Sequence, residues 1–400
     1  MMELLLEIIF WLCFGSIAYT YLAYPALLHW LARGLKASPP VLAPGEQWPM
    51  MTALMSVYNE ESVIRQKLDS LVALDYPKDR MALFIGSDCS SDGTNAAVEA
   101  YAARYPFIHF YPFEQRQGKP GVINQLARQA AGHWPIGQDH VFVITDASVM
   151  LEPRVFYCLA RHFKDPAVGL ADAHLVHTGM KAAGISKAEN QYISTEVRLK
   201  HLEGLVWGAM IGPFGACYAV RSNRFVEVPP AFLVDDFYIA MKVLEAGDKA
   251  INDLEAICYE SVSHEASEEY RRKARISAGN FQNLAVFRHL WWPPVGQLAF
   301  AFFSHKVLRW MVPFAIILML LTCGLLGLTG NLFYLILFCL MVGGLSLVPL
   351  LDGLLNRWNV NLLPLRGAHY FIMMNLALLE GFFKYIKGIR SNVWEPTKRN

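Results

Sequence analysis

Residues 141–146 read Val-Phe-Val-Ile-Thr-Asp, and two further short apolar runs in the chain also end on aspartate. They are Leu-Phe-Ile-Gly-Ser-Asp at residues 83–88 and Phe-Leu-Val-Asp-Asp at residues 232–236. Short apolar runs rich in β-branched and aromatic residues predict buried parallel strands. The carboxyl ends of such strands meet at one edge of an open α/β sheet, where ligands bind. Three aspartate positions therefore predict a site for a metal ion and a polyphosphate, although each aspartate alone could be a helix N-cap.

Strand-like and helix-like segments alternate around these runs from residue 50 to about residue 172. The expected strands cover residues 51–57, 81–85, 107–111 and 141–145, and the expected helices cover residues 60–74, 94–104 and 122–131. Alternation with short connections predicts a Rossmann-like sheet. In the less regular second half, one long helix is expected at residues 185–205, and a glycine-bearing turn at residues 212–220 leads into a strand.

The composition is too apolar for an ordinary soluble enzyme and too polar for an all-membrane transporter, since 54% of the 400 residues are hydrophobic and 17% are charged. The uncharged segment from Ile8 to Leu28 is long enough to cross a bilayer, and it lacks the basic start and the cleavage site of a signal peptide. Residues 1–35 are therefore interpreted as a transmembrane anchor. Arg33 and Lys36 follow it, so the positive-inside rule places the next domain in the cytoplasm.

A second apolar region, residues 306–385, predicts C-terminal transmembrane helices. Residues 307–350 suit two helices joined by a turn at Gly330-Asn331, and a third, shorter stretch covers residues 367–383. Three spans would put the basic tail, residues 386–400, outside, whereas the positive-inside rule puts it in the cytoplasm. The charge rule carries more weight here, so one of the apolar segments is expected to lie in the interface or not to span.

Residues 284–305 combine Arg288 and His289 with tryptophans and prolines just before that apolar region. This composition predicts an amphipathic helix at the lipid interface, with a buried core helix as the alternative. The net charge of +1 gives no reason to expect nucleic acid as a partner. The seven scattered cysteines suit reduced cytoplasmic thiols, with no zinc site and no disulfide framework.

Two segments between the expected strands and helices carry residues suited to a nucleotide and its phosphates. Asp88 ends the second expected strand, and Ser91 or Asp92 can cap the helix that follows, so Asp88 is left to accept the N3–H of a uracil ring. Residues 115–121 place glycines and Lys119 at a helix start. That pattern suits a phosphate cradle, although a solvated turn is the alternative.

Asp146 and Ser148 follow the strand at residues 141–145. A carboxylate with an oxygen ligand two residues later suits Mg²⁺ or Mn²⁺ that bridges a diphosphate. Asp235 and Asp236 open an expected helix, where one carboxylate can cap the helix and the other can act as a general base on an acceptor hydroxyl.

Arg272 and Arg275 lie three residues apart on one face of an expected helix. They could clamp a diphosphate leaving group. A patch that binds lipid headgroups is the alternative, because the apolar segments are near in the sequence.

Taken in order, these motifs resemble the membrane-bound family 2 glycosyltransferases, which include the cellulose, chitin and hyaluronan synthases. The resemblance covers about residues 50–300. It implies an α/β fold of the GT-A type at residues 48–283, on the cytoplasmic face of a multi-pass protein of the cell (inner) membrane. It also implies a nucleotide-sugar donor and inversion at the anomeric carbon.

The same resemblance implies a role for each motif residue. It assigns nucleotide-sugar binding to Tyr58, Glu60, Asp88, Lys119, Arg272 and Arg275. Asp146 matches the first aspartate of the DxD metal motif, with Ser148 as a second ligand. Asp236 matches the catalytic base of the (E/D)D motif, with Asp235 beside it.

Two departures concern the metal and the polymer. Ser148 replaces the second aspartate of DxD, so metal binding would depend mostly on Asp146 and the diphosphate. Arg272 and Ile276 replace the glutamine and the tryptophan of the QxxRW motif. Because that tryptophan is associated with the terminal sugar of a growing polymer, its absence puts processive synthesis in doubt.

The acceptor side of the site is predicted from three residues. Gly215 and Ala216 lie where the family lines its acceptor site, and Trp207 is the candidate for holding a terminal sugar. A core role for Trp207 is the alternative.

These observations favour transfer of a hexose or N-acetylhexosamine from a UDP-sugar to a growing polysaccharide. A lipid acceptor, such as a polyprenyl phosphate or a glycolipid, is the alternative. Membrane lipids and a synthase partner subunit are further candidate partners. A transporter would need more intramembrane ionisable groups. An inactive subunit of a synthase complex is not expected to retain all three aspartate positions.

Overall fold

The computed structural model describes residues 1–36, 39–42, 46–178, 186–261, 266–358, 360, 362–389 and 391–392. The chain forms two compact units. The sheet unit holds Gly34–Gly179, Val197–Ser263 and Ile389–Asn400, and the helical unit holds Met1–Arg33, Met180–Glu196 and His264–Gly388. The expected GT-A domain ended at residue 283, whereas this division places residues 264–283 in the helical unit.

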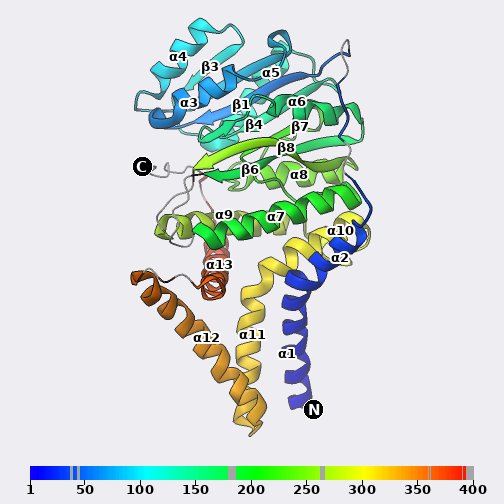
Figure 1. Ribbon diagram of the computed structural model, residues 1–400, viewed down its shortest axis with the longest axis vertical. Coiled ribbons are helices and arrows are strands. Elements are labelled where there is room, and N and C mark those ends of the chain that lie inside the picture. The colour runs from blue at the N-terminus through cyan, green and yellow to red at the C-terminus, as the bar shows by residue number, and fades with distance from the viewer. Residues whose placement is uncertain are drawn as a thin grey trace. The chain divides into compact units, whose positions relative to one another are not determined.

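The strands described in the sheet unit form one eight-stranded sheet with the order β3-β2-β1-β4-β7-β6-β8-β5 (Figure 1). Their bounds are β1 Met50–Val57, β2 Met81–Asp88, β3 Ile108–Phe113, β4 His140–Thr145, β5 Val149–Leu151, β6 Val168–Thr178, β7 Cys217–Arg221 and β8 Lys249–Ser261. The first four strands in this order are parallel, as the alternating sequence pattern predicts. Beyond them the sheet is mixed, because β7 runs antiparallel to both β4 and β6.

The helices that cover this sheet are α3 Glu61–Val72, α4 Thr94–Arg104, α5 Gly118–His133, α6 Val155–Ala160 and α8 Asp235–Glu245. α3 and α4 lie close to their predicted bounds, and α8 begins at Asp235 as expected. α5 begins four residues before the predicted helix, and α6 was not predicted. The long helix α7, Ser186–Trp207, contributes its second part to the same unit. Burial explains the pairing of helix and sheet: α3, for example, turns Ile64, Leu68 and Leu71 into the core, as the 3.6-residue period of an amphipathic helix requires.

The expected strand at residues 232–234 is wrong, because this segment is irregular. Pro229 and Pro230 precede it and lack the N–H groups that a sheet ladder needs. Ala231 then adopts a positive φ of 62°, which an extended strand excludes. The ring of Phe232 packs against Tyr238 of α8 at a centroid distance of 5.1 Å. The apolar run therefore anchors the start of a helix.

The helical unit contains the apolar segments. Its helices are α1 Met2–Ala18, α2 Tyr24–Leu31, α9 Ala266–Val286, α10 Gln297–Phe302, α11 Leu308–Leu328, α12 Leu332–Arg357 and α13 Leu363–Ile386. π-Helical turns at Tyr19–Ala23 and Phe303–Val307 join α1 to α2 and α10 to α11. α1 packs along α11, and α11 forms a hairpin with α12 (Figure 1).

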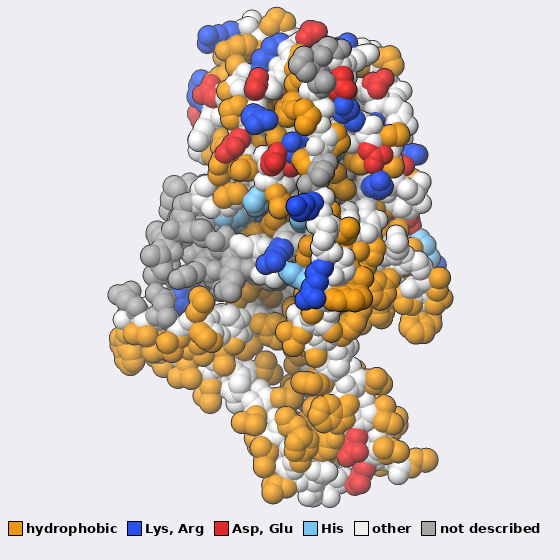
Figure 2. Space-filling view, turned by 45° about the vertical axis from the view of Figure 1, so that its right-hand side comes forward, with side chains coloured by type: hydrophobic (Ala, Val, Ile, Leu, Met, Phe, Trp, Pro, Cys, Tyr) orange, Lys and Arg blue, Asp and Glu red, His pale blue; other side chains and the backbone are white. Residues whose placement is uncertain are grey.

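In the described chain, three segments are long and apolar enough to cross a membrane: Met2–Leu31, Gln297–Leu328 and Leu332–Arg357. α13 is not among them, because Arg366, Glu380 and Lys384 interrupt it. One of these segments precedes the first strand of the sheet, and two follow its last strand. In Figure 2 the outer surface of these helices is largely hydrophobic, while charged side chains are spread over the sheet unit.

The expected amphipathic helix at residues 284–305 is also wrong. α9 continues to Val286, a single 3₁₀ turn covers Arg288–Leu290, and α10 begins only at Gln297. Pro293 and Pro294 interrupt the helix, since proline removes a backbone donor and clashes with the preceding turn. The loop that results exposes 77% of Trp292.

Candidate active site

Asp88 organises the loop that starts α5. It ends β2 and is only 2% exposed. Its two carboxylate oxygens accept the backbone N–H groups of Gln117 at 2.6 Å and Gly118 at 3.0 Å, and Nε of Arg116 at 3.0 Å. The carboxylate that the sequence assigned to a uracil ring therefore also holds the glycine-lysine loop in place.

Tyr58 and Glu60 follow β1 at the same edge of the sheet. The Arg116 guanidinium lies over the Tyr58 ring, 3.3 Å from its centroid, in a cation–π contact. Glu60 is buried, and its backbone N–H donates to Oγ1 of Thr94 at 2.9 Å. Tyr58 and Asp88 are thus linked through Arg116, which the sequence interpretation did not assign.

Lys119 brings two of the predicted aspartate positions together. Its Nζ lies 2.6 Å from Oδ1 of Asp146, which follows β4, and 3.9 Å from Oδ2 of Asp235, which begins α8. Burial alone would lower the pKa of Lys119, but the charges of Asp146 and Asp235 outweigh it and raise that pKa. The ammonium group therefore stays protonated, as a group that binds a diphosphate must.

Asp236 has the environment of a general base. It lies beside the buried Asp235 in the first turn of α8 and is itself partly exposed. Burial, followed by the charge of Asp235, raises the pKa of Asp236 to about 6, although Lys119 opposes the shift. A carboxylate that titrates near 6 holds a proton better than an ordinary aspartate and is still ionised at neutral pH.

The turn before β7 lies directly against this base. Gly215 has a positive φ of 78°, and a Cβ atom placed on it would lie 2.5 Å from Oδ2 of Asp236. The carbonyl of Ala216 accepts the N–H of Asp146 at 3.2 Å and Oγ1 of Thr145 at 3.1 Å. Of the residues predicted to line the acceptor site, Gly215 thus lies against Asp236 and Ala216 is hydrogen-bonded to Asp146.

Gly215→Ala is expected to lower the transfer rate by about 10²-fold, because the new methyl group must displace the Asp236 carboxylate. Gly247→Ala is the matched control. Gly247 also has a positive φ, of 86°, but nothing lies within 4 Å of its Cβ position. Both variants carry backbone strain of about 1–2 kcal/mol. If steady-state rates and melting temperatures fall equally in the two, contact with the base is not the cause.

Lys67 contacts the residues on both sides of the Asp146 turn, a role that the sequence interpretation did not predict. It is fully buried on α3, and its Nζ donates to Oγ1 of Thr145 at 2.9 Å and to the carbonyl of Val149 at 2.5 Å. The sequence did contain one sign that this lysine is buried: it lies among Ile64, Leu68 and Leu71 on the apolar face of a predicted helix.

The residues at this edge fit a divalent ion held together with a diphosphate. Among the described residues, no group of three His, Cys, Asp or Glu side chains is arranged to hold a metal ion. Mg²⁺ is often bound through only one or two carboxylates together with substrate phosphates. The Asp146 side chain, 39% exposed, offers one such carboxylate. The hydroxyl of Ser148 instead donates to Oε1 of Glu260 on β8 at 3.3 Å.

Three further predicted residues belong to other elements of the fold. Trp207 ends α7 and is half-buried. Arg272 and Arg275 lie on α9, which belongs to the helical unit. There, Nε of Arg272 lies 3.2 Å from Oε2 of Glu269.

Comparisons with known proteins agree on one family. Residues 52–218 match the model for glycosyl transferase family 2, and residues 140–350 match the model for glycosyl transferase family group 2. A probable glycosyltransferase, YdaM of Bacillus subtilis, is 37% identical over 90 residues, which are 22% of this chain and 21% of that protein.

Longer matches have lower identity. The poly-beta-1,6-N-acetyl-D-glucosamine synthase of Staphylococcus aureus is 23% identical over 239 residues. That match covers 58% of this chain and 55% of the synthase, so it spans about half of that relative's length. A mannosyltransferase from Pyrobaculum calidifontis, solved with GDP-mannose and Mn²⁺, superposes with a TM-score of 0.68 at 21% identity. The superposition covers 95% of this chain and 99% of the mannosyltransferase.

Proposed function

Because the chain belongs to the family 2 glycosyltransferases and has the GT-A fold, we propose that it transfers a hexose or N-acetylhexosamine from a UDP-sugar to a growing polysaccharide. The observation that carries this proposal is the cluster in which Lys119 joins Asp146 to Asp235, next to Asp236. It combines a cation for a diphosphate with a carboxylate suited to accept a proton.

The proposed reaction is a single displacement with inversion. Asp236 accepts the proton of an acceptor hydroxyl while that oxygen forms a bond to the anomeric carbon. The bond from the anomeric carbon to the diphosphate oxygen breaks, and UDP leaves with the electron pair. Lys119 stabilises the charge that develops on the departing diphosphate. No covalent sugar–enzyme intermediate is needed for one inverting step.

Asp146 is the proposed protein ligand for Mg²⁺ or Mn²⁺, with Ser148 as a weaker candidate. When bound, such an ion supplies Lewis-acid neutralisation of the diphosphate charge. Tyr58, Glu60 and Asp88 are proposed to bind the nucleotide, and Arg272 and Arg275 the diphosphate, on the basis of their motif positions.

We propose that the reaction takes place at the cytoplasmic face of the cell membrane. Support comes from the three apolar segments of the helical unit and from the lysine and arginine residues that follow the first and the last of the apolar regions. A synthase partner subunit remains a candidate partner.

The polymer is favoured over a lipid acceptor by the similarity to a synthase that is named for a poly-N-acetylglucosamine. Ile276, in place of the family's tryptophan, favours a lipid or a short acceptor. Purified protein in detergent, supplied with radiolabelled UDP-glucose or UDP-N-acetylglucosamine, separates the two. We expect label in insoluble material. Label in the lipid extract would favour the lipid acceptor, and no transfer from any UDP-sugar would contradict the proposal.

Trp207→Ala tests whether this half-buried tryptophan holds the acceptor sugar. We expect shorter products or a higher acceptor requirement, while hydrolysis of the donor to free sugar and UDP is largely preserved. A tryptophan that only fills the core would behave differently, because its truncation costs about 3–5 kcal/mol of stability. A parallel loss of melting temperature, hydrolysis and transfer in this variant would therefore exclude the acceptor role.

A further inference from the structure

The base Asp236 is packed against a turn that two buried charged residues contact. The first is Asp172 on β6, which is 0% exposed, and whose Oδ2 accepts the backbone N–H of Phe214 at 3.2 Å. The second is Lys200 on α7, which is 4% exposed, and whose Nζ lies 3.7 Å from the centroid of the Phe214 ring. Phe214 is followed by Gly215, the residue in contact with the Asp236 carboxylate.

We propose that Asp172 is a positioning residue for the catalytic base. It fixes the backbone of the Phe214–Gly215 turn against Asp236, and Lys200 holds the same turn through a cation–π contact with the Phe214 ring. This inference rests on the proposed function, because it assumes that Asp236 is the base. No motif of the sequence includes Asp172 or Lys200. Asp172 is the one polar residue in the run 168–173.

The immediate surroundings of Asp172 favour a role beyond packing. Its Oδ1 is buried and, within the described part of the chain, has no hydrogen-bond partner. The same holds for the hydroxyl of Tyr218, the residue paired with Asp172 in the β6–β7 ladder. Asn252 on β8 also lowers the pKa of Asp172 by hydrogen bonding, so a buried carboxyl is kept here with few partners, which is costly for a purely structural residue.

Charge links Asp172 to the base. Burial raises the pKa of Asp172 to about 7, the charge of Lys200 lowers it, and the charge of Asp236 raises it. Lys200 also lowers the pKa of Asp236. The two carboxyls are therefore coupled, and the pair is expected to lose its protons in two steps, near pH 6 and near pH 7.

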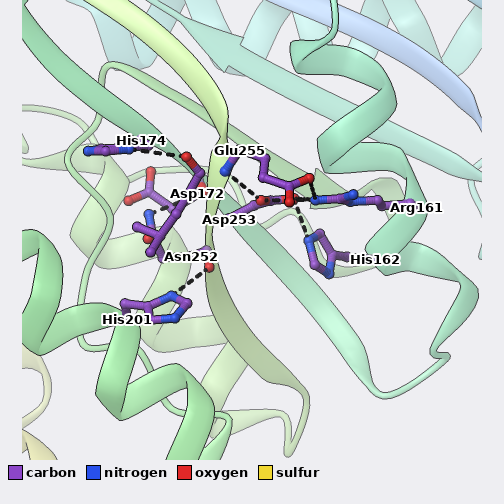
Figure 3. Close-up of polar contacts among 9 residues, drawn as sticks. Arg161, His162, Asp172, His174, His201, Asn252, Asp253 and Glu255 are labelled. Atoms are coloured by element: carbon purple, nitrogen blue, oxygen red, sulfur yellow. Dashed lines mark hydrogen bonds and ion pairs between the residues drawn. The ribbon is translucent and has the colours of Figure 1, made fainter. Parts of the chain in front are cut away.

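Further titratable groups lie on the elements around Asp172. Cys217 and Tyr218 on β7 and Cys258 on β8 stay neutral in this range, because burial is the main cause that raises the pKa of each of them. His174 on β6 and His201 on α7 face the backbone carbonyls of Leu254 and Asn252 (Figure 3).

Ionisation of Asp172 has two expected effects on the reaction. A second negative charge makes Asp236 a stronger base, and the hydrogen bond from Phe214 becomes charge-assisted. One unit of added basicity corresponds to about a threefold higher rate when the proton is half transferred. The wild-type rate is therefore expected to rise with pH in two steps, near 6 and near 7.

Substitutions of Asp172 separate its position from its charge. Asp172→Ala removes the acceptor for Phe214 and is expected to lower kcat by tenfold or more, with little change in donor KM. Asp172→Asn keeps an oxygen that can accept the Phe214 N–H, so it should recover most of that loss. Because asparagine does not ionise, the step near pH 7 should disappear while the step near pH 6 remains.

Lys200→Met gives an independent test, since loss of its positive charge should move both steps to higher pH. Asp253→Asn is the matched control. Asp253 is a buried carboxylate on neighbouring β8, paired with Arg161 at 2.9 Å and His162 at 2.7 Å, as Figure 3 shows beside Asp172. Its loss should lower the melting temperature and leave both steps where they are.

The pH profiles of kcat for the full-length protein in detergent decide between these outcomes. Three outcomes would overturn this inference without touching the proposed function. They are an active wild type with a single step, a two-step profile in Asp172→Asn, and a wild-type kcat in Asp172→Ala. Unchanged steps in Lys200→Met would also overturn it, and this holds even if the Asp172 variants fail to fold. A wild type that transfers sugar from no UDP-sugar would instead count against the proposed function.

Discussion

Asp236→Asn is expected to lower the rate of sugar transfer by about 10²–10⁴-fold, the usual cost of losing a general base, while UDP binding stays close to wild type. Asparagine has nearly the same shape as aspartate, so it should keep the contact with Gly215. It cannot accept a proton. The groups proposed to bind UDP are others, among them Lys119, which lies 2.6 Å from Asp146.

The comparison with Asp235→Asn identifies which of the two carboxylates is the base. Asp235 is buried and lies 3.9 Å from Lys119, which suits a supporting role. Transfer should be measured at saturating donor, and UDP binding by calorimetry on the same preparations. If Asp236→Asn kept more than about a tenth of the wild-type rate while Asp235→Asn did not, the assignment of the base would be wrong.

The pH dependence of the wild-type enzyme provides a second check on Asp236. Its raised pKa, about 6, means that the base loses its charge as the pH falls through that value. Activity should therefore fall on the acid side near pH 6, whereas an ordinary aspartate would remain ionised down to about pH 4.

Asp146→Ala is expected to remove the response of the enzyme to Mg²⁺ or Mn²⁺ and to weaken binding of the UDP-sugar in their presence. Asp146 is the exposed carboxylate at the end of β4, and it is also the nearest partner of Lys119, at 2.6 Å. Its loss removes both a metal ligand and a neighbour that orients the cation for the diphosphate.

Ser148→Ala should be milder, because a neutral hydroxyl is a poor ligand beside a carboxylate and because this hydroxyl already contacts Glu260. Titration of each variant with Mn²⁺ at fixed donor, followed by chelation with EDTA, measures the difference. Equal losses from the two substitutions, or full wild-type activity in EDTA, would contradict a metal site at Asp146.

Much of the sheet unit could be predicted from local patterns. The strands β1, β2 and β4 and the helix α4 lie where alternation and turn residues placed them, because each signal spans fewer than twelve residues. Parallel strands joined by helices then bring Asp88 and Asp146 to one edge of the sheet without further information. The two-helix interpretation of residues 307–350 succeeded for the same reason, since apolar length and a Gly-Asn break are local.

Local patterns failed where distant packing decides the outcome. Residues 232–234 have the composition of a strand, but the prolines before them and the contact of Phe232 with Tyr238 make them the anchor of α8. Apolar length alone left open which of the three C-terminal segments does not span. In α13, the buried Arg366 pairs with Asp352 of α12.

The supporting residues of the site were beyond the reach of sequence patterns altogether. Lys67, Asp172 and Lys200 are charged side chains in apolar or unremarked segments, and each contacts a residue that is between 14 and 82 positions away in the chain. A local pattern records which side chains tend to be buried. It does not record which partner receives a buried charge, and desolvation makes that partner decisive for whether the charge is tolerated. Only the packing of β6, α3 and α7 around the two turns shows that these charges meet a carbonyl, a hydroxyl, an amide and an aromatic ring.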